Sequence, residues 1–147
     1  MQVLVINGPN LNMLGKRDPD IYGQLSLSDI EQFTRKSLKQ RNMDIVMSWF
    51  QSNHEGEIVD KIQQADQNFD AIIINPGGYT HSSVAILDAL QCCKLSKVEV
   101  HISLVSSRES FRQQRITTAG CDIAIEGAGK FAYLLAIEYI DLLHTEN

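Results

Sequence analysis

The sequence has few of the residues and motifs that mark disulfide-bonded, metal-binding or nucleotide-binding proteins. Only three of its 147 residues are cysteine; Cys92 and Cys93 are adjacent, and no Cys-x-x-Cys spacing occurs. An odd, partly adjacent set is typical of reduced thiols and argues against a disulfide framework or a zinc site. Gly-x-Gly-x-x-Gly and Walker motifs are also missing, so we expect no metal and no nucleotide cofactor.

Positive charge and long apolar runs are scarce as well. Thirteen Lys and Arg stand against 18 Asp and Glu, which gives a net charge of −5. Without a basic stripe, the sequence argues against a nucleic-acid partner. No apolar run approaches the roughly 20 residues of a membrane span, and no leader peptide precedes the first expected strand at residue 2. We therefore expect a cytoplasmic protein with no membrane partner.

What the sequence does contain is an apolar strand followed by an amphipathic helix, five times over. The length and the 44% hydrophobic content favour one domain over residues 1–147. This alternation predicts an α/β fold with a parallel sheet between two helical layers, a three-layer sandwich; five strands favour the flavodoxin-like order 2-1-3-4-5. We expect strands near 2–7, 44–50, 71–75, 98–103 and 121–125, and helices from Ser26 or Ser28, over 56–66, from Ser82 or Ser83 to Leu95, around 107–114, and after Gly129.

The longest connection, residues 7–23, follows the first strand. It holds three Asn, two cations, two Asp and one Tyr, punctuated by Gly and Pro. A long loop beside a central strand is usually functional. Polar residues also follow the next three strands, at 51–54, 75–81 and 101–103, and the carboxyl ends of parallel strands share one edge. We expect these residues to form a site for a small polar substrate, closed by the long loop.

Two residues of the fourth strand, Glu99 and His101, form a candidate general acid. Spacing of two residues places both side chains on one face of a strand. A carboxylate beside an imidazole can fix its tautomer and favour its protonated form. The alternative is a buried structural ion pair.

Tyr22 is the candidate general base. The guanidinium of Arg17, five residues earlier, could lower the pKa of the phenol by favouring its phenolate. The alternative is a tyrosine that packs the long loop against the body of the protein.

Three neutral polar side chains near the strand ends are candidate substrate ligands. Asn12 and Asn75 can donate to an oxyanion or a hydroxyl group, or can hold their own loops by Asx-type bonds. His81 can bind a substrate hydroxyl or cap the third helix.

Arg108 and Arg112 could form a fork for a carboxylate if they lie on one side of a helical turn. The alternative is a solvated face shared with Glu109, which we favour more for Arg108. The backbone N–H groups of Ile102 and Ser103, at a strand end, also suit a carboxylate.

Asp88 follows Val84 by one helical turn, so we expect both on the inward side of the third helix. A half-buried Asp needs a cationic partner, and its own helix offers none. A neighbouring subunit could supply that partner.

Six segments of the chain together resemble the signature of the type II 3-dehydroquinate dehydratases. They are residues 7–23, 51–56, 74–85, 99–103, 108–112 and the Gly127-x-Gly129-x-x-x-Tyr133 spacing. The resemblance implies a flavodoxin-like lyase of the shikimate pathway that needs no cofactor. Such enzymes remove water from 3-dehydroquinate by anti elimination through an enolate, which gives 3-dehydroshikimate.

The same resemblance implies a role for each candidate residue and an assembly. Tyr22, activated by Arg17, would take the C2 proton, and His101, held by Glu99, would protonate the departing hydroxyl. Family members form trimers packed into dodecamers, in which Asp88 would reach a neighbour's site. The remaining roles implied are enolate support through a water for Asn12, hydroxyl binding for Asn75, His81 and Arg112, and carboxylate binding for the backbone of Ile102 and Ser103.

Four positions depart from the family pattern. Leu104 stands where the family usually has Asn, Leu87 where it has Arg, and residues 113–115 where it has His-x-Ser; a usual Pro is missing at 96–97. These changes motivate one alternative, a non-catalytic relative that binds a quinate-like polyhydroxy acid. Another is the same reaction serving quinate breakdown.

Overall fold

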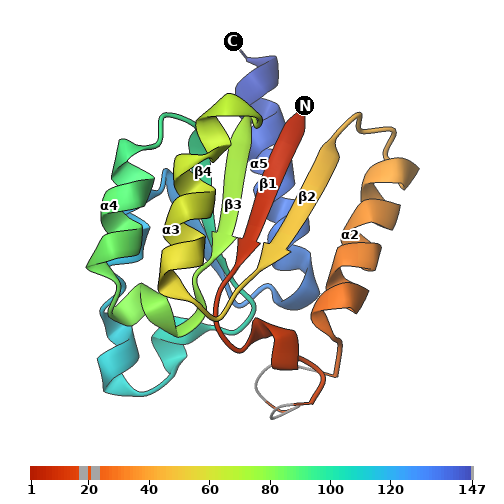
Figure 1. Cartoon of the computed structure of the whole chain (residues 1–147). Helices are drawn as coiled ribbons and strands as arrows, with labels where there is room; N and C mark the ends of the chain where they lie inside the picture. Colours follow the sequence, from red (N-terminus) through yellow and green to blue (C-terminus); the bar gives the residue numbers. More distant parts are fainter. Residues whose placement is uncertain (17–19, 21–23, 147) are drawn as a thin grey trace.

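A computed structural model describes residues 1–16, 20 and 24–146. Within these residues, five parallel strands form one sheet in the order β2-β1-β3-β4-β5, so the order predicted from the sequence is confirmed (Figure 1). The strands are β1 (Gln2–Asn7), β2 (Val46–Gln51), β3 (Ala71–Asn75), β4 (Ser96–His101) and β5 (Ile123–Glu126).

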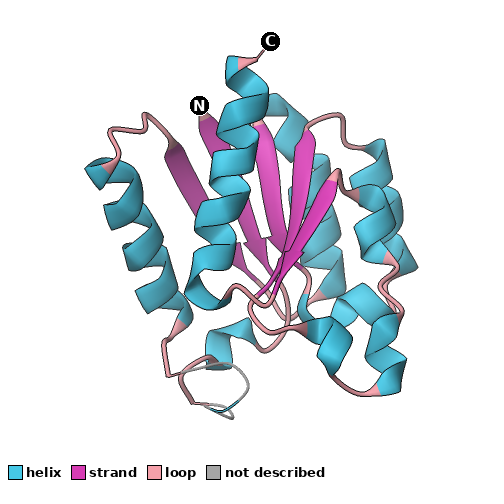
Figure 2. Cartoon of the chain, turned by 180° about the vertical axis from the view of Figure 1, so that it is seen from behind, coloured by secondary structure: helices cyan, strands magenta, loops and turns pink. Residues whose placement is uncertain are grey.

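Helices cover both faces of the sheet. α3 (Glu55–Gln63) and α4 (Val84–Cys92) pack on one face, and α2 (Leu27–Gln40) and α5 (Ala132–Thr145) on the other (Figures 1 and 2). Alternate residues of each central strand enter the two cores, because side chains of a strand point to opposite faces. In β1, Val3 and Val5 pack with α2 and α5, while Leu4 and Ile6 pack with α3 and α4. Burial on both faces explains the continuously apolar strands.

Side-chain caps decide where two helices begin. The Ser26 hydroxyl accepts from the Asp29 amide at 3.1 Å, and the Asp29 carboxylate accepts from the Ser26 amide at 2.9 Å. This reciprocal capping box selects Ser26 over Ser28. Ser83, rather than Ser82, caps α4 by accepting from the Ile86 amide at 2.9 Å.

Several expected boundaries are wrong by two or three residues. β2 begins at Val46, and β4 covers 96–101. β5 begins only at Ile123, the first of its residues to pair with β4, opposite Val98. α3 ends at Gln63 and α4 ends at Cys92, each three residues earlier than expected. Just after α4, the Cys93 and Leu95 carbonyls accept hydrogen bonds from Lys97 Nζ at 2.9 and 2.7 Å. The short helix that the sequence allowed around 107–114 is a 3-10 turn over Ser110–Gln113, and further 3-10 turns cover Val105–Ser107 and Thr117–Gly120.

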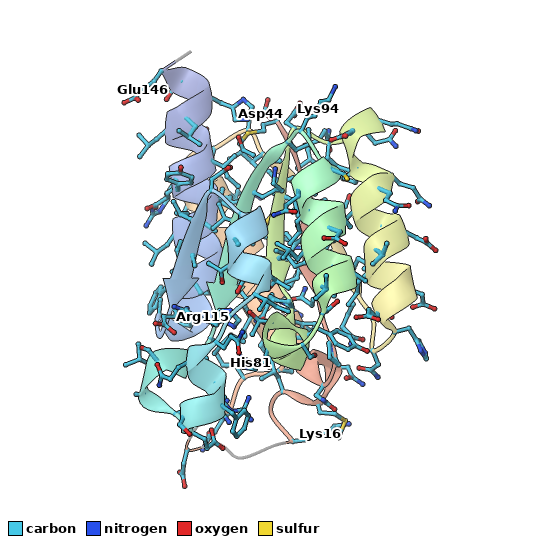
Figure 3. All side chains as sticks on the ribbon, turned by 90° about the vertical axis from the view of Figure 1, so that its left-hand side faces the viewer. Lys16, Asp44, His81, Lys94, Arg115 and Glu146 are labelled. Atoms are coloured by element: carbon cyan, nitrogen blue, oxygen red, sulfur yellow. The ribbon has the colours of Figure 1, made fainter. Side chains whose placement is uncertain are left out.

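The carboxyl ends of the strands meet at one end of the molecule. Asn7 of β1 lies between Gln51 of β2 and Asn75 of β3 in the sheet register. Both termini lie at the opposite end (Figure 1). Figure 3 shows His81 and Arg115 at the carboxyl-end rim, far from Asp44 and Lys94. No helix in the described part of the chain could span a membrane.

Candidate active site

A cavity of about 160 Å³ opens at the carboxyl ends of β3 and β4. A second cavity of about 520 Å³ adjoins it; Ile102, Ser103 and Arg108 line both. The smaller cavity brings together seven of the candidates named from the sequence. Its lining residues are Pro9, Asn10, Leu11, Asn75, Gly77, Gly78, His81, His101, Ile102, Ser103, Val105, Arg108 and Arg112.

His101 and Glu99 form a buried pair in the wall of this cavity. His101 Nε2 lies 2.7 Å from Glu99 Oε1, and the two residues are 5% and 0% exposed. The expected placement of both side chains on one face of β4 is confirmed. Because Nε2 faces the carboxylate, Nδ1 is the ring nitrogen that is left for the cavity.

Three threonine hydroxyls hold the same carboxylate, and none was found from the sequence. Thr80 and Thr118 donate to Oε1 at 3.0 and 2.8 Å, and Thr117 donates to Oε2 at 2.7 Å. Burial alone would raise the pKa of Glu99, but His101 and the threonine hydroxyls outweigh it and hold that pKa below its ordinary value. Thr117 and Thr118 escaped notice because residues 104–118 show no helical or strand period.

Asn75 is held by a buried hydrogen-bond network with Tyr133 of α5 and Asn7 of β1. Its Nδ2 donates to the Tyr133 hydroxyl at 3.2 Å, and that hydroxyl donates to Asn7 Oδ1 at 2.6 Å. The Gly77 amide donates to Asn75 Oδ1 at 3.2 Å, so the Asx-type bond coexists with a place in the cavity wall. Burial raises the pKa of Tyr133, which keeps this phenol neutral.

Of the three candidates on the long loop, Asn12 is the one that the structure describes. Asn12 is exposed on the 3-10 turn Leu11–Met13, next to Leu11 of the cavity wall. The candidate base Tyr22 and its activator Arg17 lie outside the described residues.

His81 lines the cavity and does not cap a helix. Its Nδ1 donates to the Gln114 carbonyl at 2.7 Å, while Ser83 provides the cap of α4. This bond fixes the ring between the loop after β3 and the segment after β4. Its Nε2 remains as the ring nitrogen that a ligand hydroxyl can use.

Arg108 and Arg112 share Glu109, but not through one helical turn. Arg112 Nε lies 2.8 Å from Glu109 Oε2, and Arg108 Nε lies 3.6 Å from the same oxygen. The solvated face favoured for Arg108 is wrong, because its side chain is only 16% exposed, less than the 23% of Arg112. Both guanidinium groups line the small cavity.

The backbone at Ile102 and Ser103 is oriented by the turn after β5. The carbonyls of His101 and Ile102 accept from the amides of Gly127 and Gly129 at 3.2 and 3.0 Å. In a trans peptide unit, the N–H group of the following residue points in the direction opposite to the carbonyl group. The N–H groups of Ile102 and Ser103 therefore point away from this turn, toward the side of β4 where the small cavity lies.

Asp88 corrects one expectation outright. It is exposed, and Val84 is 58% exposed, so both point outward from α4 rather than into the core. The helix instead buries Ile86, Ala89 and Leu90. A spacing of four residues places Asp88 and Val84 on one side of a helix without telling which side faces inward.

The residues at three positions that depart from the family pattern make hydrogen bonds or ion pairs away from the buried His101–Glu99 pair. Gln113 Nε2 donates to the Ser106 carbonyl at 2.7 Å, and Arg115 Nη1 lies 3.3 Å from Glu126 Oε2. The Lys97 amide donates to Asp122 Oδ2 at 2.8 Å, a bond that proline could not make. Among the described residues, no three His, Cys, Asp or Glu side chains gather as a metal site would require.

Comparison with known proteins gives a consistent result. Residues 1–141 match the dehydroquinase class II family. A 3-dehydroquinate dehydratase of Thermotoga neapolitana is 46% identical over 147 residues, covering 100% of this chain and 99% of the relative. One of Thermotoga petrophila is 53% identical over 144 residues, covering 95% and 94%.

Solved structures agree in fold as well as in sequence. The type II dehydroquinase of Butyrivibrio crossotus superposes with a TM-score of 0.91 at 46% identity, covering 96% of this chain and 97% of the other. That of Propionibacterium acnes gives 0.86 at 34% identity, covering 95% and 94%. Because residues 1–141 match the family and these relatives agree over nearly the whole chain in sequence and fold, the chain belongs to the class II dehydroquinase family.

Proposed function

We propose that this protein removes water from 3-dehydroquinate to give 3-dehydroshikimate, as a lyase of the shikimate pathway. The observation that carries the proposal is the buried His101–Glu99 pair in the wall of a small polar cavity. The named relatives, 3-dehydroquinate dehydratases at 46% and 53% identity, support the same substrate. At about 160 Å³ the cavity suits a small acid better than the drug-sized ligands of roughly 300–1,000 Å³ pockets.

Elimination β to a ketone needs a base, an acid and stabilisation of the enolate oxygen. We assign the acid to His101, which lines the cavity while Glu99 binds its Nε2. A carboxylate fixed on the far nitrogen orients the ring and stabilises the charge of a doubly protonated imidazole. Such a ring can release one proton to the departing hydroxyl group.

We assign the base to the long loop after β1. Tyr22 would take the C2 proton as a phenolate that Arg17 stabilises, on the face opposite His101 for an anti elimination. Asn12 would support the enolate oxygen through a water molecule. This chemistry needs proton transfer and fixed dipoles alone, so we propose no cofactor.

The remaining cavity groups are suited to the substrate's polar substituents. Asn75, His81 and Arg112 would bind its hydroxyl groups, since each lines the cavity and can donate a hydrogen bond. The N–H groups of Ile102 and Ser103 would bind its carboxylate, with Arg108 in the same wall.

We also propose a homo-oligomer of trimers assembled into a dodecamer, in the cytoplasm. Asp88 and Val84 are exposed side by side on α4, which is where a neighbouring subunit could be reached. Sedimentation equilibrium of the purified protein tests the assembly. Whether the reaction serves biosynthesis or quinate breakdown is a separate question, which the neighbouring genes can answer.

The experiment that tests the function is a direct assay. Purified protein mixed with 3-dehydroquinate should produce the ultraviolet absorbance of a conjugated enone, and Tyr22→Phe should abolish this rise while the substrate still binds. A folded protein that gives no rise contradicts the proposal. Calorimetric binding of a quinate-like acid without turnover would instead favour the non-catalytic relative that the departures at Leu104 and Leu87 suggest.

A further inference from the structure

We propose that Thr80, Thr117 and Thr118 are positioning residues that keep the proton shared by Glu99 and His101 on the imidazole. This inference deepens the proposed function, because His101 can act as an acid only while it carries that proton. The threonines act through Glu99 and do not line the cavity.

The geometry surrounds the carboxylate with hydroxyl donors from two separate loops. Thr80 lies in the 3-10 turn Gly77–His81 after β3, and Thr117 and Thr118 open the turn Thr117–Gly120. Thr80 and Thr117 are 1% and 0% exposed, and their hydroxyl oxygens lie 2.9 Å apart. Glu99 Oε1 therefore meets Thr80, Thr118 and His101, while Oε2 meets Thr117.

A buried carboxylate and imidazole that share one proton can exist in two forms. The proton sits on the imidazole as an ion pair, or on the carboxyl group as a neutral pair, which burial favours. Hydroxyl groups that donate to the carboxylate stabilise only its charged form. Thr117 also lies within hydrogen-bond distance of Thr80, so these two hydroxyl groups share their protons between that contact and Glu99, while Thr118 donates to Glu99 as well. These donors move the balance toward the ion pair, in which His101 holds the proton.

No other group near the carboxylate does the same work among the described residues. Within this part of the chain, Glu99 forms an ion pair only with His101. Cys121 lies close enough to feel the charge of Glu99; burial and that charge raise the pKa of its thiol, so it stays neutral. Around the cavity, the charged or titratable neighbours of His101 are His81, Arg108 and Arg112, and both arginines lie beside Glu109.

The experiment replaces single hydroxyls in the full-length protein. Thr117→Val and Thr118→Val remove a donor at nearly constant volume, and Thr117→Ser keeps it. Thr34→Val is the matched control, because Thr34 is fully buried and its hydroxyl donates to the Ile30 carbonyl within α2, away from Glu99. If Thr117→Val fails to fold, the half-buried Thr118 carries the test.

The first readout is the ¹⁵N signal of the His101 ring at neutral pH, assigned by its loss in His101→Gln. We expect both ring nitrogens protonated in the parent protein, in Thr34→Val and in Thr117→Ser. In Thr117→Val and Thr118→Val, we expect a shift toward the neutral ring. Unchanged ring signals in both valine variants would overturn the proposal. Because this readout needs no turnover, it stands or fails independently of the dehydratase activity.

The second readout is the pH profile of 3-dehydroquinate turnover. With the hydroxyl removed, kcat should fall about tenfold, the change that one pKa unit of displaced balance produces. The alkaline limb of kcat/KM should move to higher pH, because the pair holds its last proton more tightly. A merely structural role would lower the amount of active enzyme and leave that limb in place, and this result would contradict the inference.

Discussion

Two carboxylate pairs stand at the same cavity and differ in almost every physical respect. The Glu99–His101 pair is buried, with side chains 0% and 6% exposed, and three hydroxyls also bind the carboxylate. In the Glu109–Arg112 pair the side chains are 56% and 23% exposed. Solvent and salt screen an exposed pair, so its net contribution to stability is small. The Glu99–His101 pair is therefore a fixed part of the cavity wall, whereas the Glu109–Arg112 pair is open to solvent.

The largest expected effect comes from removing His101, the proposed acid of the buried pair. His101→Gln should lower kcat by at least about 100-fold, because a positioned general acid contributes about 10²–10⁴ to the rate. Steady-state assay of 3-dehydroquinate dehydration measures the loss, with thermal melting as the check on folding. A folded variant that retains more than half of the parent kcat would remove His101 from the mechanism.

The next largest effect is expected on the free energy of unfolding when the carboxylate of Glu99 is removed. At neutral pH, Glu99→Gln should lower the free energy of unfolding by about 3 kcal/mol, as breaking a buried pair does. The folded-state pKa of Glu99 is lowered, so its stabilisation is present above the ordinary value of 4.5 and is lost as the pH falls through the folded pKa. Urea unfolding at pH 7 and below pH 4 should therefore show the difference between parent and variant shrinking in acid. A difference that grows in acid would contradict this sign.

A smaller effect is expected from the uncharged hydrogen-bond network of Asn7, Tyr133 and Asn75. Tyr133→Phe removes the hydroxyl that joins Asn7 and Asn75 and should cost about 1–3 kcal/mol of unfolding free energy. Because Asn75 is a proposed hydroxyl ligand, KM should rise more than kcat falls. Tyr139→Phe, at a half-buried position of the same helix, is the control and should change neither. If both variants behave alike, the hydroxyl network does not orient Asn75.

The smallest effect is expected at the exposed pair. Glu109→Gln leaves Arg112 free of its carboxylate and should change KM by less than about threefold, with no measurable change in unfolding free energy. Raising the salt concentration should reduce even this difference. A loss of stability as large as that of Glu99→Gln would end the contrast between the two pairs.

The sequence could predict the features that follow from a local period. Apolar runs marked the strands, the alternation of five strands with helices favoured the order 2-1-3-4-5, and the spacing of two residues placed Glu99 beside His101. It could not choose between Ser26 and Ser28 as a cap, since both precede an acid by three residues. It placed Asp88 on the wrong side of α4, because a spacing of four residues does not say which side is buried.

The features that could not be predicted depend on contacts between distant parts of the chain. The hydroxyls of Thr117 and Thr118 meet Glu99 across 18 and 19 residues, from a segment without periodicity. Tyr133 meets Asn7 across 126 residues, although its place on the inward side of the last helix was expected. Such polar partners become visible only when the fold brings their segments together.

We propose that the Glu99–His101 pair supplies the acid while a different group takes the C2 proton. Deuterium exchange at C2 of 3-dehydroquinate, followed by NMR in deuterated buffer, separates these two steps. With His101→Gln, we predict that deuterium enters C2 while almost no conjugated enone forms, because the enolate returns to the substrate when no acid completes the elimination. Formation of the enone by this variant at the parent rate would contradict the account.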